Sequence, residues 1–123
     1  MAESAEVVAA YGAAWNEKDE GKRKALLEKA WSDGATYTDP SAHVEGRDAL
    51  VAHIAGFHGG MPGAQLALTS AVDEHHGSVR FTWAIKGTDG AQMMEGVDFG
   101  VLGDDGRLAS ITGFFGPPAP PSG

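Results

Sequence analysis

Residues 79–86 constrain the fold most strongly, because apolar and polar side chains alternate there with a period of two. A strand with this pattern buries one face and leaves the other in water. Asp89-Gly90 follows directly and is typical of a two-residue hairpin turn. The stretch therefore predicts an antiparallel hairpin whose apolar face is formed by Val79, Phe81, Trp83 and Ile85.

Further strands are predicted on both sides of this hairpin. Residues 65–72 also alternate, and His75-His76-Gly77 forms a turn after them. Residues 91–102 carry apolar side chains of both parities, so we expect both faces of that strand to be covered. The turn Asp104-Asp105-Gly106 then leads to a last strand over residues 107–115.

The first half of the chain has helical periodicity instead. Apolar side chains recur three and four residues apart over residues 4–17, 20–32 and 47–57, which predicts three helices. Gly34 follows the second helix and is predicted to be its C-cap. Three helices followed by four antiparallel strands indicate an α+β architecture, in which a curved sheet wrapped by helices encloses a pocket.

Composition narrows the class of protein. The 123 residues fit one domain, predicted over residues 1–116, followed by a flexible Pro-rich tail over residues 117–123. A net charge of −8 argues against a nucleic-acid partner. No apolar run is long enough to cross a membrane, and the start of the chain lacks the pattern of a signal peptide. Because cysteine is absent, thiol catalysis and Cys-ligated zinc are excluded, and we expect a cytoplasmic protein. We expect no cofactor and no metal site, because His75 and His76 would point to opposite faces of a strand and no carboxylate cluster accompanies them.

Three polar residues stand out by position. A short β-like run, residues 35–39, ends at Asp39, and Pro40 stops the chain directly after it, before a predicted loop over residues 41–46. Tyr11 lies beside the apolar stripe of the first helix, and Asp98 has Gly96 and Gly100 as its neighbours on the same strand face. Each also has a structural interpretation: a core tyrosine, a turn cap and a carboxylate bonded to backbone.

The order of elements, together with Tyr11, Thr38-Asp39-Pro40 and Val97-Asp98-Phe99, resembles the nuclear transport factor 2-like (NTF2-like) superfamily over Val7–Gly116. Within it the chain is most similar to the SnoaL-like group and the ketosteroid isomerases. The resemblance implies a cone-shaped α+β fold, three N-terminal helices packed on a curved, mostly antiparallel sheet. It also implies that Asp39 is a general base, and that Tyr11 and a protonated Asp98 donate hydrogen bonds to an oxyanion.

This interpretation predicts a small apolar ligand that contacts side chains from several elements. The function implied is proton-transfer isomerisation or cyclisation of an apolar carbonyl compound; the alternative is a pocket that binds a hydrophobic ligand without catalysis. Trp83 is bulkier than the small aliphatic residue expected at its position and narrows the pocket. The predicted substrate-binding residues are Trp15, Tyr37, His53, Phe57, Phe81, Trp83, Ile111 and Phe115.

Two other enzyme classes of the superfamily match the sequence less well. The Asp-Arg-Asp set of the superfamily's epoxide hydrolases is not matched, because Arg80 falls on the face opposite Phe81. A scytalone dehydratase-like reaction would have only His53 to use. A neutral Asp98 beside Tyr11 favours the enzyme, whereas an ionised Asp98 paired to Arg80 or Arg107 favours a structural role.

The apolar face formed by Val97, Phe99 and Val101 predicts a homodimer through the sheet.

Overall fold

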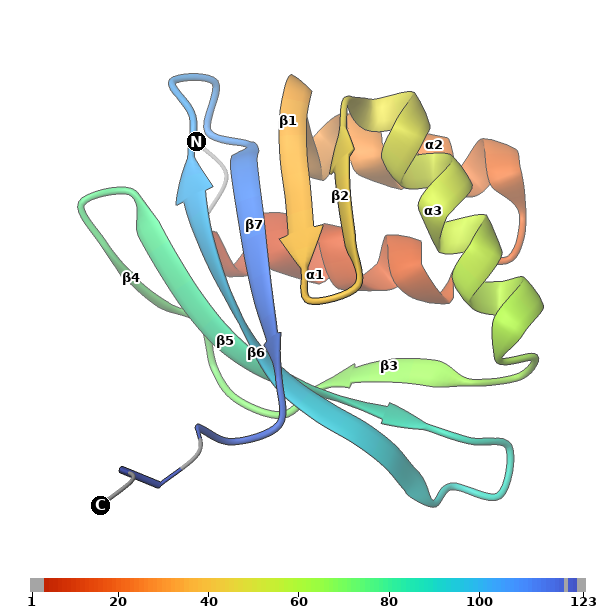
Figure 1. The fold of residues 1–123 in the computed structure, drawn as a ribbon. Coiled ribbons are helices and arrows are strands. Elements are labelled where there is room, and N and C mark those ends of the chain that lie inside the picture. Colours follow the sequence, from red (N-terminus) through yellow and green to blue (C-terminus); the bar gives the residue numbers. More distant parts are fainter. Residues whose placement is uncertain (1–3, 119, 122–123) are drawn as a thin grey trace.

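The computed structural model describes residues 4–118 and 120–121, and within them the chain forms three helices and one seven-stranded sheet (Figure 1). The α+β architecture predicted from the sequence is therefore confirmed. The helices are α1 (Ser4–Asn16), α2 (Glu20–Ala30) and α3 (Arg47–Gly60). The strands are β1 (Trp31–Asp39), β2 (Ala42–Glu45), β3 (Gln65–Leu68), β4 (Asp73–His75), β5 (Ser78–Lys86), β6 (Gln92–Leu102) and β7 (Leu108–Phe115).

The sheet is mixed and strongly curved. Its strand order is β2-β1-β7-β6-β5-β3, and β4 pairs with the start of β5. β1 runs parallel to β7, whereas the other paired strands are antiparallel. Figure 1 shows the sheet bending around the helices, which gather on one side of it. The first strand of the chain thus lies beside the last one within the sheet.

Tyr11 lies at the centre of the aromatic core and fixes α1 against the sheet. Its ring stacks on Trp31 at a centroid distance of 5.6 Å and an interplanar angle of 15°. It meets Trp15 and Phe81 edge to face, at 6.5 and 6.4 Å. Such aromatic pairs add about 1 kcal/mol each beyond the burial of their surface. The position of α1 is therefore determined by contacts with β1 and β5.

The end of the second helix differs from the prediction. α2 ends at Ala30, and Trp31 already has extended backbone (φ −123°, ψ 118°) as the first residue of β1. Gly34 has a φ of +84°, but it lies inside β1, where the register with β7 shifts between Trp31 and Thr36. The predicted C-cap was wrong, because the chain must turn into the sheet early enough to place the Trp31 ring on Tyr11.

Two other segments also form different elements from those predicted. Residues 42–45 are not loop but strand β2, which pairs with β1 so that Ala42 lies opposite Asp39. A four-residue strand is too short for its alternation to be recognised. The predicted strand over residues 65–72 ends at Leu68, and β4 follows as a separate strand. The two pair with opposite ends of β5, which is why the chain breaks between them.

The tail and the helices bear on two other expectations. Residues 117–118 and 120–121 form neither helix nor strand, whereas residues 119 and 122–123 of the predicted tail lie outside the described residues. Its flexibility stays a prediction. In the part of the chain that the structure describes, the helices are too short and too polar to cross a bilayer.

The outer face of the sheet exposes large apolar side chains. The exposed fraction is 57% for Met93, 43% for Phe99, 49% for Val101 and 53% for Phe114. The rings of Phe99 and Phe114 pack edge to face across β6 and β7, at a centroid distance of 5.9 Å. In the single chain the helices lie on the opposite face, so this apolar surface meets solvent.

We predict that two copies of the chain pair through this outer face. Light scattering at micromolar concentration should give the mass of a dimer, because pairing would remove the exposed rings from water. Phe99→Glu should shift the mass to that of a monomer. Ala52→Glu, on the exposed side of α3, is the matched control and should remain a dimer. A monomeric wild type would contradict the prediction.

Candidate functional site

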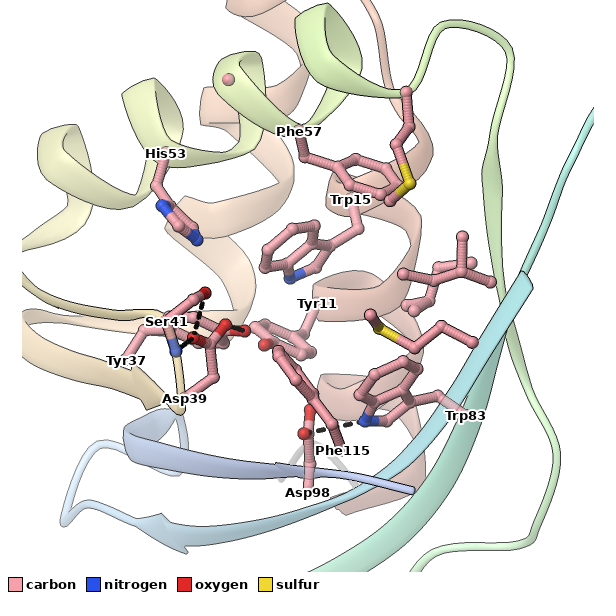
Figure 2. Close-up of a pocket in the computed structure, with 15 residues that line it drawn as sticks. Tyr11, Trp15, Tyr37, Asp39, Ser41, His53, Phe57, Trp83, Asp98 and Phe115 are labelled. Atoms are coloured by element: carbon pink, nitrogen blue, oxygen red, sulfur yellow. Dashed lines mark hydrogen bonds between the residues drawn. The ribbon is translucent and has the colours of Figure 1, made fainter.

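An open cavity of about 510 Å³ lies on the inner face of the sheet, beneath α1 and α3 (Figure 2). This volume lies in the range of pockets for small organic ligands. Its walls are mostly aromatic and aliphatic, with a few polar side chains. The lining residues are Tyr11, Trp15, Tyr37, Asp39, Ser41, His53, Gly56, Phe57, Met61, Leu66, Trp83, Ile85, Met94, Asp98 and Phe115.

The structure brings together most of the residues singled out from the sequence. Tyr11, Asp39 and Asp98 all line the cavity, and so do six of the predicted contact residues: Trp15, Tyr37, His53, Phe57, Trp83 and Phe115. Phe81 and Ile111 do not line it; they are 1% and 0% exposed in the core behind its wall. Phe81 packs against Tyr11 and so supports the wall from the outside.

Ser41 is the polar lining residue that sequence reasoning missed. It stands two residues after Asp39, and an aspartate often bonds to the residue two positions on in such a turn. That spacing could have revealed it. The other missed lining residues are Gly56, Met61, Leu66, Ile85 and Met94. Their only signal in the sequence is that they are apolar or small, which most core residues share.

Asp39 is held at the end of β1 by three donors. Its Oδ1 accepts from the backbone N–H and the hydroxyl of Ser41, both at 2.7 Å, and its Oδ2 accepts from the Tyr37 hydroxyl at 2.6 Å. Partial burial raises the pKa of Asp39, but these hydrogen bonds outweigh it and hold the pKa below the ordinary 3.8. Asp39 is therefore ionised at neutral pH, with one lone-pair site of Oδ2 still open.

Tyr37 connects Asp39 to the aromatic side of the cavity. Its ring lies 5.4 Å from the ring of His53 and 5.5 Å from that of Trp15. Burial raises the pKa of Tyr37, and the hydrogen bond to Asp39 raises it further. Its hydroxyl therefore keeps its proton and stays a donor to Asp39.

Asp98 has the opposite environment. It is 5% exposed, and its Oδ1 accepts one hydrogen bond, from the Trp83 indole N–H at 2.9 Å. Burial in this apolar wall raises the pKa of Asp98 to about 7, although the indole hydrogen bond opposes the rise. Arg80 pairs with Asp73 and Arg107 with Asp105, so the ion pair of the structural interpretation is not found.

Tyr11 faces the same cavity from α1. It is 1% exposed, and burial raises its pKa well above the ordinary value, as does the nearby charge of Asp98. Its hydroxyl is therefore a neutral donor at any physiological pH. Tyr11 and a protonated Asp98 together supply two donors to one apolar space.

The two carboxyl groups lie on either side of one glycine. Gly113 of β7 is the register partner of Asp98 on β6. A Cβ placed on Gly113 would lie 2.7 Å from Asp98 Oδ1 and 3.7 Å from Asp39 Cβ. Asp39 and Asp98 therefore extend from the strands that flank β7, over the bare backbone of Gly113.

The chemistry that this arrangement can perform is acid–base chemistry. An ionised carboxylate and two neutral donors face an apolar cavity, and neither lysine nor arginine is among its lining residues. Among the residues that the structure describes, no cluster of His, Asp and Glu is suited to hold a metal ion.

The chain matches known relatives in sequence and in fold. The SnoaL-like domain model matches residues 8–111. The structure of a proposed isomerase of the SnoaL-like family from Agrobacterium tumefaciens is 32% identical, with a TM-score of 0.86 over 90% of this chain and 95% of that one. No functionally curated protein matches.

More distant structures show the same fold. An NTF2-like protein of unknown function from Cytophaga hutchinsonii is 17% identical, with a TM-score of 0.70 over 95% of this chain and 93% of that one. A proposed SnoaL-like polyketide cyclase from Jannaschia sp. CCS1 is 16% identical, with a TM-score of 0.67 over 89% and 85%. The cone-shaped NTF2-like fold expected from the sequence is thus confirmed, and the chain belongs to the SnoaL-like domain family.

Proposed function

We propose that the protein catalyses proton transfer, an isomerisation or a cyclisation, on an uncharged apolar carbonyl compound. The observation that carries the proposal is that two carboxyl groups with opposite surroundings line one apolar cavity: Asp39 accepts three hydrogen bonds, whereas the buried Asp98 accepts one. A pair of groups whose surroundings push their pKa values apart is typical of an acid and base that work together. The relatives described as an isomerase and a cyclase support the same class.

Asp39 is the base of the proposed reaction. Its Oδ2 removes the proton from the carbon beside the carbonyl group, and the C–H electrons move into a dienolate or enolate. In an isomerisation the same proton returns to the far end of the double bond, which restores the carboxylate. Tyr37 and Ser41 hold Asp39 in place through both steps.

Tyr11 and Asp98 stabilise the negative charge that develops on the substrate oxygen. Both donate from an apolar wall, where a hydrogen bond to a growing charge is worth far more than in water. Because the donors are held in place before the reaction, no solvent has to reorganise. Loss of one such donor typically costs about a hundredfold or more in kcat.

The lining also restricts the substrate class. Neither lysine nor arginine lines the cavity wall and the net charge is −8, so a carboxylate or phosphate group on the substrate would meet no permanently charged cation there. Aromatic walls from Trp15, Phe57 and Phe115 suit a ring or a flat apolar chain instead. The proposed substrate is therefore neutral.

One observation favours the alternative, a cavity that binds a hydrophobic ligand without catalysis. The bonds from both groups of Ser41 to Asp39 Oδ1 are those of an aspartate that caps a turn. A carboxylate that stabilises a turn in this way needs no catalytic role. Kinetics of an Asp39 variant separate the two functions.

The first prediction concerns the base. Purified protein mixed with a cyclic β,γ-unsaturated ketone should produce the absorbance of the conjugated enone. Asp39→Asn should lower the rate by about a thousandfold, because an amide cannot accept the proton. A one-ring ketone and a 3-ketosteroid should be compared, since Trp83 narrows the cavity. Asp33→Asn, exposed on the same strand, is the control. Equal rates for Asp39→Asn and wild type would contradict the role of Asp39.

The second prediction concerns pH. Activity needs Asp39 ionised and Asp98 protonated, so kcat/KM should stay high down to about pH 4 and fall above a pH of about 7, where Asp98 loses its proton. Asp98→Asn keeps a neutral donor at this position and should remove the alkaline fall. A flat alkaline limb in the wild type would exclude Asp98 as a protonated donor.

The third prediction is thermodynamic. The pKa of Asp98 rises on folding from 3.8 to about 7, so the folded state holds a proton that the unfolded chain releases. The contribution of Asp98 to stability should therefore be fully present below pH 4 and be lost as pH rises through about 7. The difference between these two pKa values corresponds to a loss of at most about 4 kcal/mol in the free energy of unfolding. Asp98→Asn should remove this loss, so its melting temperature should exceed that of wild type at pH 8 but not at pH 4. Equal pH dependence would show that Asp98 ionises freely in the fold.

A further inference from the structure

Trp83 and Asp98 form a buried hydrogen-bonded pair on neighbouring strands. The indole Nε1 lies 2.9 Å from Asp98 Oδ1, and each residue is 5% exposed. Figure 2 shows the indole of Trp83 reaching along the cavity wall to the carboxyl group, beside Phe115. The Phe115 ring meets the indole edge to face at a centroid distance of 6.1 Å, which restricts its rotation.

The chemistry of the indole determines which carboxyl oxygen carries the proton. An indole N–H only donates, so the oxygen that it contacts must act as an acceptor. The C=O oxygen of a neutral carboxyl group accepts a hydrogen bond better than its O–H oxygen, so the proton of a neutral Asp98 favours Oδ2 while the indole holds Oδ1. Oδ2 has no hydrogen-bond partner among the described residues and is not among their fully buried unpaired atoms, so it opens onto the cavity.

Two glycines make room for this pair. Gly96 is the register partner of Trp83, and a Cβ placed there would overlap the indole atom Cζ2. A Cβ on Gly113 would lie 2.7 Å from Asp98 Oδ1, closer than real Cβ contacts allow. Neither glycine has a positive φ, so close approach rather than backbone conformation requires them. Because Gly96 and Gly113 lack side chains, the inner face of the sheet has room for the Trp83 indole and the Asp98 carboxyl group.

We propose, on the basis of the proposed function, that Trp83 is a positioning residue that anchors Oδ1 of Asp98 and so directs the Oδ2 proton to the carbonyl oxygen of the substrate. Trp83 does not touch the reacting atoms in this role. Its effect on the reaction passes through Asp98, and Gly96 and Gly113 provide the space that the anchor needs.

The first test observes the pair without activity. In a ¹H–¹⁵N spectrum of the whole protein, the indole signal of Trp83, assigned by its loss in Trp83→Phe, should shift with the ionisation of Asp98. The shift should be absent in Asp98→Asn. Gly113→Ala, which crowds Oδ1 from β7, should move the same signal while Trp83 is intact. If the Trp83 indole signal of the wild type does not shift with pH, the hydrogen-bonded pair of Trp83 and Asp98 is contradicted.

The second test is kinetic and uses the enone assay. Trp83→Phe keeps an aromatic ring but removes the donor, so kcat should fall about tenfold with little change in KM. Its alkaline limb should move to higher pH, because the lost hydrogen bond stabilised the carboxylate. Lys86→Gln, at an exposed position of the same strand and away from the cavity lining, is the control and should leave both kcat and the alkaline limb in place.

The outcomes separate the two proposals. If wild type is active and the kcat and alkaline limb of Trp83→Phe are those of wild type, the positioning role is overturned and the proposed function stands. If wild type converts none of the ketones, the proposed function fails and the positioning role fails with it. A pH-dependent indole signal would then identify a structural pair.

Discussion

The parallel pairing of β1 with β7 is the constraint on which the candidate site depends. Thr38 is the register partner of Thr112, so the end of β1 lies beside the middle of the last strand. Since β6 lies on the other side of β7, the carboxyl groups of Asp39 and Asp98 face each other across one strand, although 58 positions separate them in the chain. A sheet built only from sequential hairpins would not bring these two residues together.

The cavity in turn depends on where the sheet lacks side chains. Trp83 and Asp98 occupy space that a Cβ at Gly96 or Gly113 would fill. Both side chains therefore fit on the inner face of the sheet without separating the strands. On the helix side, the stack of Tyr11 on Trp31 holds α1 at a fixed position above this hollow. Helix and sheet thus enclose a space that remains open instead of collapsing into core.

Much of this could be predicted from the sequence, because the strongest local patterns agree with the fold. The alternation of β5 and the helical periodicity of α1 and α3 each specified one element, and the resemblance to the NTF2-like superfamily indicated Asp98 as a site residue. What failed had weak or competing local signals. Gly34 follows a helical pattern as a C-cap would, yet the tertiary contact of Trp31 ends the helix earlier.

The details of the site were the least predictable, because they depend on contacts between distant segments. Sequence patterns show that Asp98 and Trp83 have inward parity but not that the indole reaches the carboxyl group, which depends on the register of β5 with β6. The same holds for Phe81 and Ile111: both have inward parity, but both are buried in the core, Phe81 against the Tyr11 ring, and neither lines the cavity. The parity of a strand residue predicts the face of the sheet on which its side chain lies, but not how deeply that side chain is buried.

The hydrogen bonds that position Asp39 also weaken it as a base. Each donor that stabilises the carboxylate lowers its affinity for a proton, and Asp39 has three. Removal of a carbon-bound proton by such a base is feasible only if the charge that appears on the substrate oxygen is well stabilised. The proposed reaction therefore depends chiefly on Tyr11 and Asp98. Asp98 can contribute only as a neutral acid, and its burial in the apolar wall is what keeps it neutral. The same burial lowers the stability of the fold once Asp98 ionises.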